Sequence, residues 1–467
     1  MAKLVDALDL GSSSRKGVGV QVPSLAPYIQ KTRREIMDEA LLVLELQRIR
    51  STACSATVIV PAQWIDRLYD HASSKQQKRS QAHGFRQGTV PLNYIQTNFK
   101  STLVEHVKEF LFNYCVVSFL YKELYNQHVL FAGEPRLVSI SVEPHQNGLF
   151  TFELNTFPPF EIDNWKYLPF KVPKRKQYKD LDRQVEGFVK EEKELLKKNQ
   201  SEEIAMGDWV HFLITIIDEH GSSLINGLTE SVWLKLGDEE IDKELATLFI
   251  GKKVGDSFCS INKDLQSYFS DLMNTDYNFH LRIVDIQHDK FFCLDQFKNC
   301  FKIKTNKDMY KKMIEVFSYR NDMSQRRSMA EESLKLLLSK NPFIVPNHLA
   351  LRQQATILNS MRSSPDYHAY RTQADFKKRV QQLAERQTKE CLLLDQMAYH
   401  ENISVTNEDI KQYINLTKRP RTKEFIYFDP ITTKIKGQEV PISTEEFKLP
   451  CLREKTLNYI IHHLTKE

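Results

Sequence analysis

The chain has 467 residues, which is too long for one ordinary core and predicts two to four domains. Its 41% hydrophobic and 27% charged residues are typical of a globular protein in water, and the net charge of +5 permits contact with RNA without requiring it. No apolar run approaches the roughly 20 residues of a membrane helix. Seven scattered cysteines lack zinc-type spacing, so we expect reduced thiols and no metal site.

The first 36 residues differ in character from the rest of the chain. They carry charges but no continuous apolar segment, so they are not typical of a secretory signal. Residues 1–16 read like the conceptual translation of a transfer-RNA gene upstream of a start codon. We therefore expect Met37 to begin the natural protein, and residues 1–36 to be disordered or wrongly assigned.

Residues 37–162 have the pattern of a small domain of strands and helices. Apolar residues at helical spacing predict one helix over 62–77 and a long central helix from 91 to about 120. β-Branched or alternating stretches predict three strands, at 56–60, 137–142 and 150–155. An antiparallel sheet with two helices on one face accommodates these elements.

The stretch between the two predicted helices has the composition of a rigid loop. Gly84 and Gly88 permit backbone angles that other residues avoid, and Pro91 is suited to the first turn of the following helix. Phe85 and Arg86 are expected at the tip. An aromatic ring beside a guanidinium is suited to stacking and phosphate contact on folded RNA. The alternative is an ordinary connecting loop with Phe85 turned into the core.

This loop resembles the ribosome-docking signature of bacterial trigger factor, Gly-Phe-Arg-x-Gly-Lys-x-Pro. The chain has Thr89 where the family has lysine, although Lys78 and Arg79 just upstream can partly replace that charge. The resemblance extends from about Ser55 to about Leu416. It implies a cytoplasmic, ATP-independent chaperone with no cofactor and no membrane partner. Its implied partners are ribosomal protein and rRNA near the exit tunnel, unfolded nascent chains and, off the ribosome, a second copy of the chain. Family roles in protein transport and cell division are implied in the same way.

Residues 163–202 are expected to form an extended connector. The segment opens with prolines and a group of lysines and arginines, and a charged helix is predicted over 185–198. Such charge runs are usually solvated faces rather than RNA sites. In trigger factor the corresponding segment leads from the ribosome-binding domain along an extended body.

Residues 203–290 resemble the FKBP-type prolyl isomerase domain of the same family, on strand pattern and glycine spacing. Strands are predicted at 210–217, 232–236 and 280–286. In the family, an aspartate–phenylalanine pair in the first strand and a Val/Ile-Pro-Gly-Phe-Glu turn line the catalytic pocket. Counted from the glycines, the pocket positions here are Leu213, Ile214, Asp242, Lys243 and Leu245.

Neither pocket motif is preserved, which bears on the enzymatic prediction. Charges at Asp242 and Lys243 are unfavourable in a pocket that must exclude water. We therefore expect an FKBP-like fold whose isomerase activity is weak or lost, with no confident catalytic residue. The alternative is a shifted register, in which other aromatic residues such as Phe212 or Tyr268 line a working site.

Residues 291–467 are expected to form an all-helical region, which in trigger factor makes arms around a cradle for unfolded segments. Helices are predicted over 308–339, 348–362, 376–401 and 407–416. Thr406 and Asp409 have the spacing of a capping box. The break at 341–346 resembles the family's Asn-x-Phe-x-Val-Pro turn. The basic tail from Thr417 has no interpretation from sequence.

Several apolar residues around that break are candidates for contact with unfolded clients. They are Ile344, Leu349, Leu351, Ile357 and Met361. Core packing of the same side chains is the alternative, because a sequence does not separate an exposed stripe from a buried one.

The whole pattern predicts an α+β multidomain protein and leaves three functions open. The first is a chaperone that docks at the ribosomal exit tunnel, which needs no catalytic constellation. The second is an active prolyl isomerase on nascent chains. The third is a ribosome-free assembly chaperone, suggested by Thr89.

Overall fold

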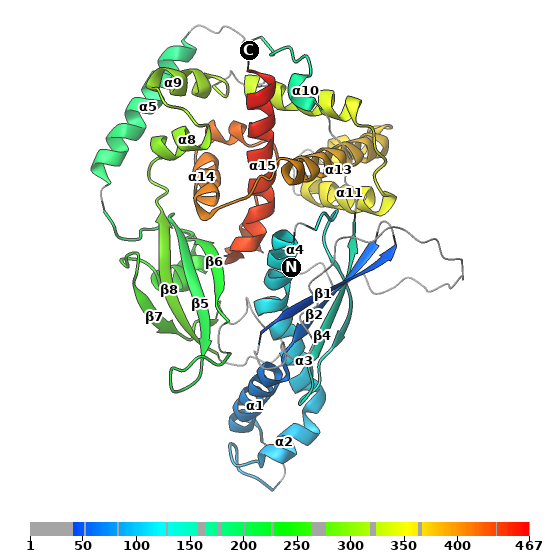
Figure 1. Cartoon of the computed structure of the whole chain (residues 1–467). Helices are drawn as coiled ribbons and strands as arrows, with labels where there is room; N and C mark the ends of the chain where they lie inside the picture. Colours follow the sequence, from blue (N-terminus) through cyan, green and yellow to red (C-terminus); the bar gives the residue numbers. More distant parts are fainter. Residues whose placement is uncertain are drawn as a thin grey trace, which may run out of the picture. The chain divides into compact units, whose positions relative to one another are not determined.

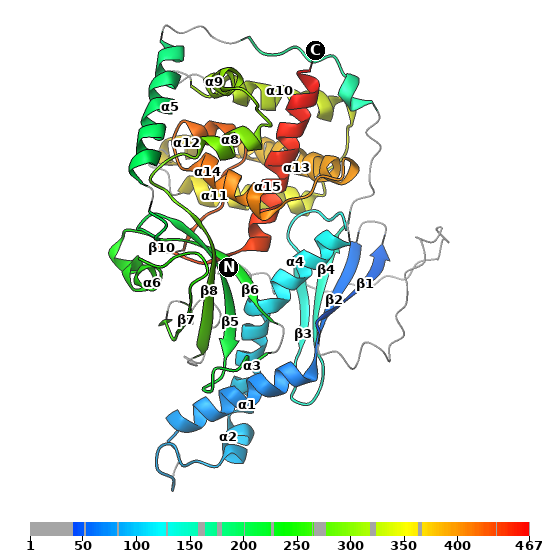
Figure 2. The same cartoon turned by 60° about the vertical axis from the view of Figure 1, so that its left-hand side comes forward.

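The computed structural model describes residues 41–50, 53–81, 84–127, 129–156, 164–174, 180–199, 201–225, 228–263, 265, 277–317, 324–362, 367–435 and 437–466. The N-terminal extension 1–36 and Tyr268 lie outside these residues. Antiparallel sheets and helices both occur, which confirms the α+β class (Figures 1 and 2). Among the described residues, no helix is long and apolar enough to cross a membrane.

The first sheet has four antiparallel strands in the order β1-β2-β4-β3. They are β1 (Val43–Arg50), β2 (Ala53–Val60), β3 (Arg136–Ser141) and β4 (Gly148–Asn155). The last three confirm the predicted strands, and Val58, Phe150 and Phe152 point into the core as the alternation requires. Strand β1 was not predicted from the sequence: most of its residues are exposed, and only Leu44 and Leu46 alternate with polar residues, Glu45 and Gln47.

The helices of this region bury apolar side chains such as Leu68, Phe110 and Leu120. They are α1 (Ala62–Arg79), α2 (Leu92–Asn98), α3 (Lys100–Leu111) and α4 (Val117–Asn126). The predicted central helix is divided, because Phe99 separates α2 from α3 and a π-helical turn, Phe112–Val116, joins α3 to α4. Phe112 stacks on Phe152 of β4 at 6.3 Å between ring centroids, which places this turn against the sheet.

The second sheet has five strands in the order β11-β6-β5-β8-β7. They are β5 (Trp209–Ile217), β6 (Glu230–Lys235), β7 (Ser257–Ser260), β8 (Asn278–Gln287) and β11 (Ile442–Ser443). The three predicted strands of this region are confirmed in β5, β6 and β8. The edge strand β11 comes from far along the chain, and its pairing of Ile442 with Trp233 is a tertiary event that local pattern does not reveal.

The remaining elements are mostly helical. They are η3 (Trp165–Tyr167), α5 (Leu181–Lys198), η4 (Glu240–Asp242), α6 (Lys243–Thr247), α8 (Leu294–Cys300), α9 (Asn306–Ile314), α10 (Gln325–Lys340), α11 (Asn347–Arg362), α12 (Tyr367–Arg371), α13 (Phe376–His400), α14 (Asn407–Thr417), η5 (Thr422–Phe425), β9 (Lys434–Ile435), β10 (Gln438–Glu439) and α15 (Thr444–Leu464). The predicted capping box is confirmed at the start of α14, where Thr406 and Asp409 cap each other's backbone N–H groups.

Helix α15 lies between the other C-terminal helices (Figure 1) and contributes to two hydrophobic clusters. Phe447 packs edge-on against Trp209 of the second sheet at 5.8 Å between centroids. At the other end of the helix, Leu457 and Ile461 pack with residues of α10 and α13. Helix α15 was not predicted from the sequence of the C-terminal tail, although it occupies the centre of the helical region.

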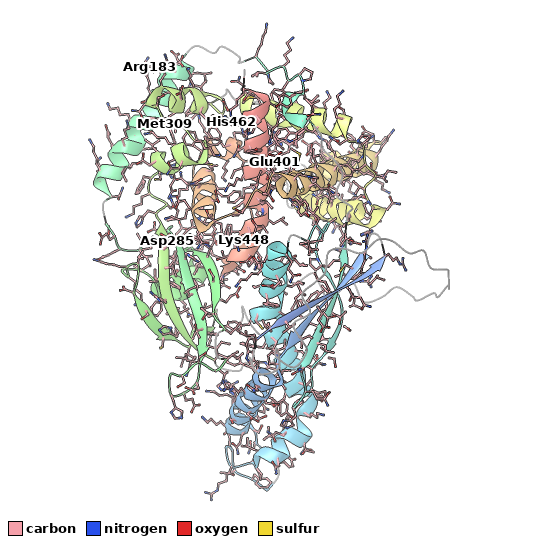
Figure 3. The ribbon with its side chains drawn as sticks, viewed as in Figure 1. Arg183, Asp285, Met309, Glu401, Lys448 and His462 are labelled. Carbon is pink, nitrogen blue, oxygen red and sulfur yellow. The ribbon has the colours of Figure 1, made fainter. Side chains whose placement is uncertain are left out.

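Glu401, the residue after α13, lies near α15 (Figure 3) and joins both helices to η3. The Trp165 indole donates a hydrogen bond to one carboxylate oxygen of Glu401 (2.9 Å). Lys166 (2.6 Å) and the Tyr459 hydroxyl (2.7 Å) donate to the other. These three donors hold the pKa of Glu401 below its ordinary value against the effect of burial, which acts in the opposite direction.

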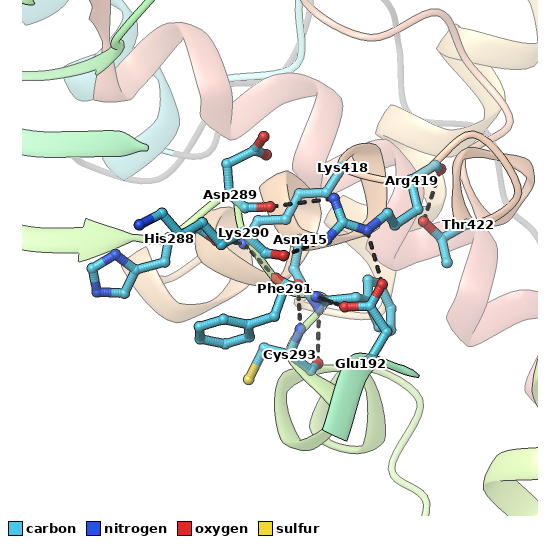
Figure 4. Close-up of polar contacts among 11 residues, drawn as sticks. Glu192, His288, Asp289, Lys290, Phe291, Cys293, Asn415, Lys418, Arg419 and Thr422 are labelled. Atoms are coloured by element: carbon cyan, nitrogen blue, oxygen red, sulfur yellow. Dashed lines mark hydrogen bonds and ion pairs between the residues drawn. The ribbon is translucent and has the colours of Figure 1, made fainter. Parts of the chain in front are cut away.

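Arg419 organises the segment that leaves β8 (Figure 4). Its guanidinium donates to the backbone carbonyls of Asp289 (3.2 Å) and Lys290 (2.7 Å). Its Nε pairs with the buried Glu192 of α5 at 2.9 Å. The second oxygen of Glu192 accepts the N–H of Phe292. Arg419 and Glu192 therefore satisfy each other and a stretch of backbone that no regular element pairs.

Two further side chains at the end of α14 complete this cluster. The Asn415 amide bonds both the N–H and the carbonyl of Cys293, at 2.9 Å each. Lys418 donates to the carbonyls of His288 and Phe291. Burial lowers the pKa of Lys418 to about 8. The basic tail left without an interpretation is thus a packing element that binds backbone carbonyls.

Glu230 is a buried carboxyl where α4, β6 and β11 meet. It accepts a hydrogen bond from Ser118 of α4 at 2.6 Å, and the Ser118 hydroxyl also contacts that of Ser443 at 3.2 Å. Burial raises the pKa of Glu230 to about 7, although its two serine partners act in the other direction. Burial therefore favours the protonated form of this carboxyl.

The raised pKa of Glu230 predicts a pH-dependent stability. The native state retains a proton that the unfolded chain loses near pH 4.5, so this stabilisation is complete below that pH and lost as pH rises through 7. A Glu230→Gln variant should be more stable than the wild type at pH 8, by up to about 3 kcal/mol, and similar to it at pH 4. Urea unfolding followed by tryptophan fluorescence at both pH values measures this. An equal difference at the two pH values would contradict the assignment.

Candidate functional site

The loop between α1 and α2 has the backbone that its glycines suggest. Gly84 and Gly88 both have positive φ, +87° and +83°, a conformation that side chains other than glycine rarely adopt. Pro91 is the N-cap of α2, and its carbonyl accepts the N–H groups of Tyr94 (3.0 Å) and Ile95 (3.2 Å). The two glycines therefore set the bends, and the proline leads directly into a helix.

Thr89, which replaces the lysine of the family signature, closes a turn within the loop. Its N–H (3.1 Å) and its hydroxyl (2.8 Å) both donate to the carbonyl of Arg86. At the base, the Gln77 amide of α1 donates to the carbonyl of Val90 at 2.6 Å, and Val90 is fully buried. The loop is thus fixed at its base and across its second half.

The tip of the loop presents Phe85 and Arg86 outward. Phe85 is 41% exposed, so it is not turned into the core as the alternative prediction required. Its ring lies 6.2 Å from that of Tyr94, which is exposed to a similar degree. Arg86 is exposed beside it. The Phe85 ring and the Arg86 guanidinium on the loop, with Tyr94 at the start of α2, offer stacking and phosphate contact to a flat or charged partner.

The expected isomerase-pocket positions are used for packing or are exposed. Ile214 and Leu245 are buried, Leu213 is half-buried, and Lys243 lies exposed beside Glu240. The carbonyl of Ile214 accepts a hydrogen bond from the Tyr114 hydroxyl of the π-helical turn at 3.1 Å. Phe212, the aromatic of the alternative register, is fully buried against Phe249, at 4.8 Å between ring centroids.

Asp242 contacts β10, a strand from the C-terminal part of the chain. Its carboxylate accepts the backbone N–H of Glu439 in β10 at 2.8 Å, and both side chains are buried. A side chain at Gly237 would collide with the Asp242 carboxylate, so the turn here is closely packed. No local pattern could have found this contact, because the two residues are almost 200 positions apart.

The candidate client-binding residues fall into three groups, which are exposed, buried and half-buried. Ile344 is 90% and Leu351 63% exposed. Leu349 is buried in a small cluster with Val345 and Leu392. Ile357 and Met361 are half-buried on α11. The structure therefore separates exposed apolar residues from a packing residue on the same helix.

Other parts of the described chain offer no metal site. No group of three or more His, Cys, Asp or Glu residues with metal-binding geometry occurs within the described ranges. A cavity of about 460 Å³ lies among α8, α14 and α15, lined by residues such as Tyr413 and Glu454. None of the expected isomerase-pocket positions lines it.

Comparison with known proteins supports the family suggested by the loop. Residues 44–188 match the family model described as bacterial trigger factor protein, and residues 307–423 match the model of its C-terminus. The chain is 25% identical over 439 residues to the trigger factor of Aquifex aeolicus, covering 90% of this chain and 86% of that protein. It is 24% identical over 389 residues to the trigger factor of a Geobacter species (strain M21), covering 80% and 87%.

A solved structure of a trigger factor chaperone, from work on promiscuous substrate recognition in folding and assembly, also aligns. It covers 90% of this chain at 16% identity, with a TM-score of 0.33, which is too low to compare the arrangement of elements. The two family models together span more than half of the chain, in the expected order. This chain belongs to the trigger factor family.

Proposed function

We propose that this chaperone docks at the ribosomal exit tunnel through residues 84–91 and shields nascent chains in the cytoplasm without ATP. The observation that carries the proposal is the rigid loop that exposes Phe85 and Arg86. A contact surface that is already ordered loses little conformational entropy on binding. The partners at this surface are ribosomal protein and rRNA beside the tunnel.

The docking proposal predicts a selective effect of the loop tip. A Phe85→Ala/Arg86→Ala variant should bind ribosomes roughly tenfold or more weakly, because it removes one stacking and one phosphate contact. Co-sedimentation with vacant ribosomes over a range of salt concentrations measures this. A Tyr167→Ala/Lys171→Ala variant, which removes an exposed aromatic and a cation elsewhere, is the matched control. Equal binding by the two variants would refute the role of the loop.

For client contact we propose the exposed apolar residues around the start of α11. Ile344 and Leu351 offer apolar area to water with no cost of opening the fold, whereas Leu349 holds the helix in place. Broad, weak apolar contact of this kind suits binding of many unfolded sequences. Ile357 and Met361 can extend the surface along the same helix.

Client capture should therefore depend on a few exposed side chains. An Ile344→Ser/Leu351→Ser variant should suppress aggregation of a chemically denatured protein several-fold less well, with its own thermal unfolding unchanged. Light scattering during refolding measures the effect. Ile261→Ser, which alters an exposed isoleucine of the FKBP-like unit, should behave as the wild type. Loss of activity in the control variant as well would argue against a localised client surface.

The alternative function, prolyl isomerisation, is disfavoured by the use of Ile214, Asp242 and Leu245 in packing. We expect no measurable acceleration of cis–trans exchange in a proline tetrapeptide. NMR exchange spectroscopy can detect such acceleration without a coupled protease. Acceleration that disappears in a Phe212→Ala variant would instead support the shifted register.

The third function, a ribosome-free assembly chaperone, is distinguished by the same ribosome experiment. If the wild type does not sediment with ribosomes at any salt concentration but still suppresses aggregation, this function is favoured. Light scattering of the purified chain then tests the homodimer that the family suggests.

A further inference from the structure

Two lysines at the end of α1, next to the loop, share one carboxylate. Lys75 Nζ lies 3.1 Å and Lys78 Nζ 2.8 Å from the same oxygen of Glu219. Glu219 belongs to the hairpin between β5 and β6, so the pair connects the loop region to the FKBP-like unit. A carboxylate oxygen between two ammonium groups has the local chemistry of a bound phosphate oxygen.

The hairpin around Glu219 is built independently of the two lysines. Asp218 accepts the N–H groups of His220 (2.8 Å) and Ser222 (2.9 Å), and Gly221 has a φ of +82°. Glu219 therefore projects from a turn that its neighbours define. The two lysines hold the pKa of Glu219 well below its ordinary range, at about 2, so its carboxylate is charged at neutral pH.

The same lysines lie where the loop lacks a cation. The backbone carbonyl of Lys78 lies 3.9 Å from the position of a Cβ at Gly88, so the second half of the loop returns to the end of α1. Position 89, next to Gly88, is threonine and contributes no charge. Lys78 is 60% and Glu219 53% exposed at the side chain, so water and a polyanion reach both groups.

We infer that Lys75 and Lys78 form a phosphate-binding site for the RNA backbone, which supplies the positive charge missing at Thr89, and that Glu219 occupies this site when RNA is absent. The inference rests on the proposed ribosome docking for its biological setting. Exposed ion pairs contribute little to stability. When the lysines bind a row of RNA phosphates, counterions condensed on the RNA are released, which favours binding. The RNA can therefore displace the single carboxylate of Glu219 from the two lysines.

Uncharged contacts hold the hairpin's unit against α1 and α3. Tyr277 is buried, its ring stacks on that of His71 at 5.2 Å between centroids, and its hydroxyl bonds the buried His106 at 2.7 Å. Phe110 packs on the same ring at 4.4 Å. Because these contacts do not involve Glu219, removing its charge should leave the interface intact. The effect of charge on RNA binding can thus be measured separately from folding.

The test compares the full chain with Glu219→Gln, Lys75→Gln/Lys78→Gln and the control Glu244→Gln. Glu244 is an exposed carboxylate of the same unit, so the control has the same net charge as Glu219→Gln. Two probes are used: vacant ribosomes, and a short hairpin of ribosomal RNA free in solution. Binding is followed by fluorescence anisotropy between about 50 and 200 mM salt.

The expected results differ for each variant. Glu219→Gln should bind the RNA hairpin about three- to tenfold more tightly than Glu244→Gln at low salt, because its lysines have no competing carboxylate. The Lys75→Gln/Lys78→Gln variant should bind the RNA hairpin more weakly than the wild type. The slope of log binding constant against log salt concentration should be smaller in magnitude by about 1 to 2. If Glu219→Gln matches Glu244→Gln, or if the lysine variant matches the wild type, the inference is wrong.

The ribosome arm separates this inference from the docking proposal. If the variants differ as expected in their binding to the RNA hairpin but no variant binds ribosomes, the phosphate site is supported and the docking proposal fails. If the wild type binds ribosomes through Phe85 and Arg86 but neither probe responds to Glu219→Gln, docking stands and the inference fails. Circular dichroism and thermal unfolding of each variant exclude a change in fold as the cause.

Discussion

The backbone that leaves β8 carries carbonyl groups that no sheet or helix pairs, and satisfying them joins several parts of the chain. Arg419 binds two of these carbonyls and the carboxylate of Glu192, and Asn415 binds both backbone groups of Cys293. Unpaired buried backbone groups are costly, so these side chains determine where α5, α8 and α14 can pack. Lys418 keeps a lowered pKa in this cluster because it is buried.

Similar packing occupies the region of the second sheet, at the positions where the sequence predicts an isomerase pocket. Its sheet ends in β11, a strand from the C-terminal region, and Asp242 binds the backbone of Glu439 from the same region. Tyr114 binds the carbonyl of Ile214 from the other side. Ile214 and Asp242, which the sequence places in the expected pocket, instead bond to neighbouring elements of the fold.

The surfaces proposed for function are those that packing leaves free. Phe85 and Arg86 project from a loop whose shape is fixed by two glycines and by Thr89, so exposure there needs no supporting partner. Ile344 is exposed at the turn before α11, while Leu349 one turn on is buried. Order at the base and exposure at the tip of the loop suit the RNA contact that we propose. The exposed isoleucine suits the less specific apolar contact that we propose with clients.

The sequence by itself determined the local features: the strands β2, β4, β5 and β8, the loop, and the capping box at Thr406. Each follows from side-chain periodicity or from a backbone requirement of a few neighbouring residues. Tertiary structure alone decided the edge strand β11, the central place of α15, and the pairing of Lys75 and Lys78 with Glu219. These depend on contacts between residues far apart in sequence, so their free energy leaves no periodic trace in the local pattern. Exposure also belongs to the second group, because Leu349 and Leu351 are alike in sequence and differ only in what packs against them.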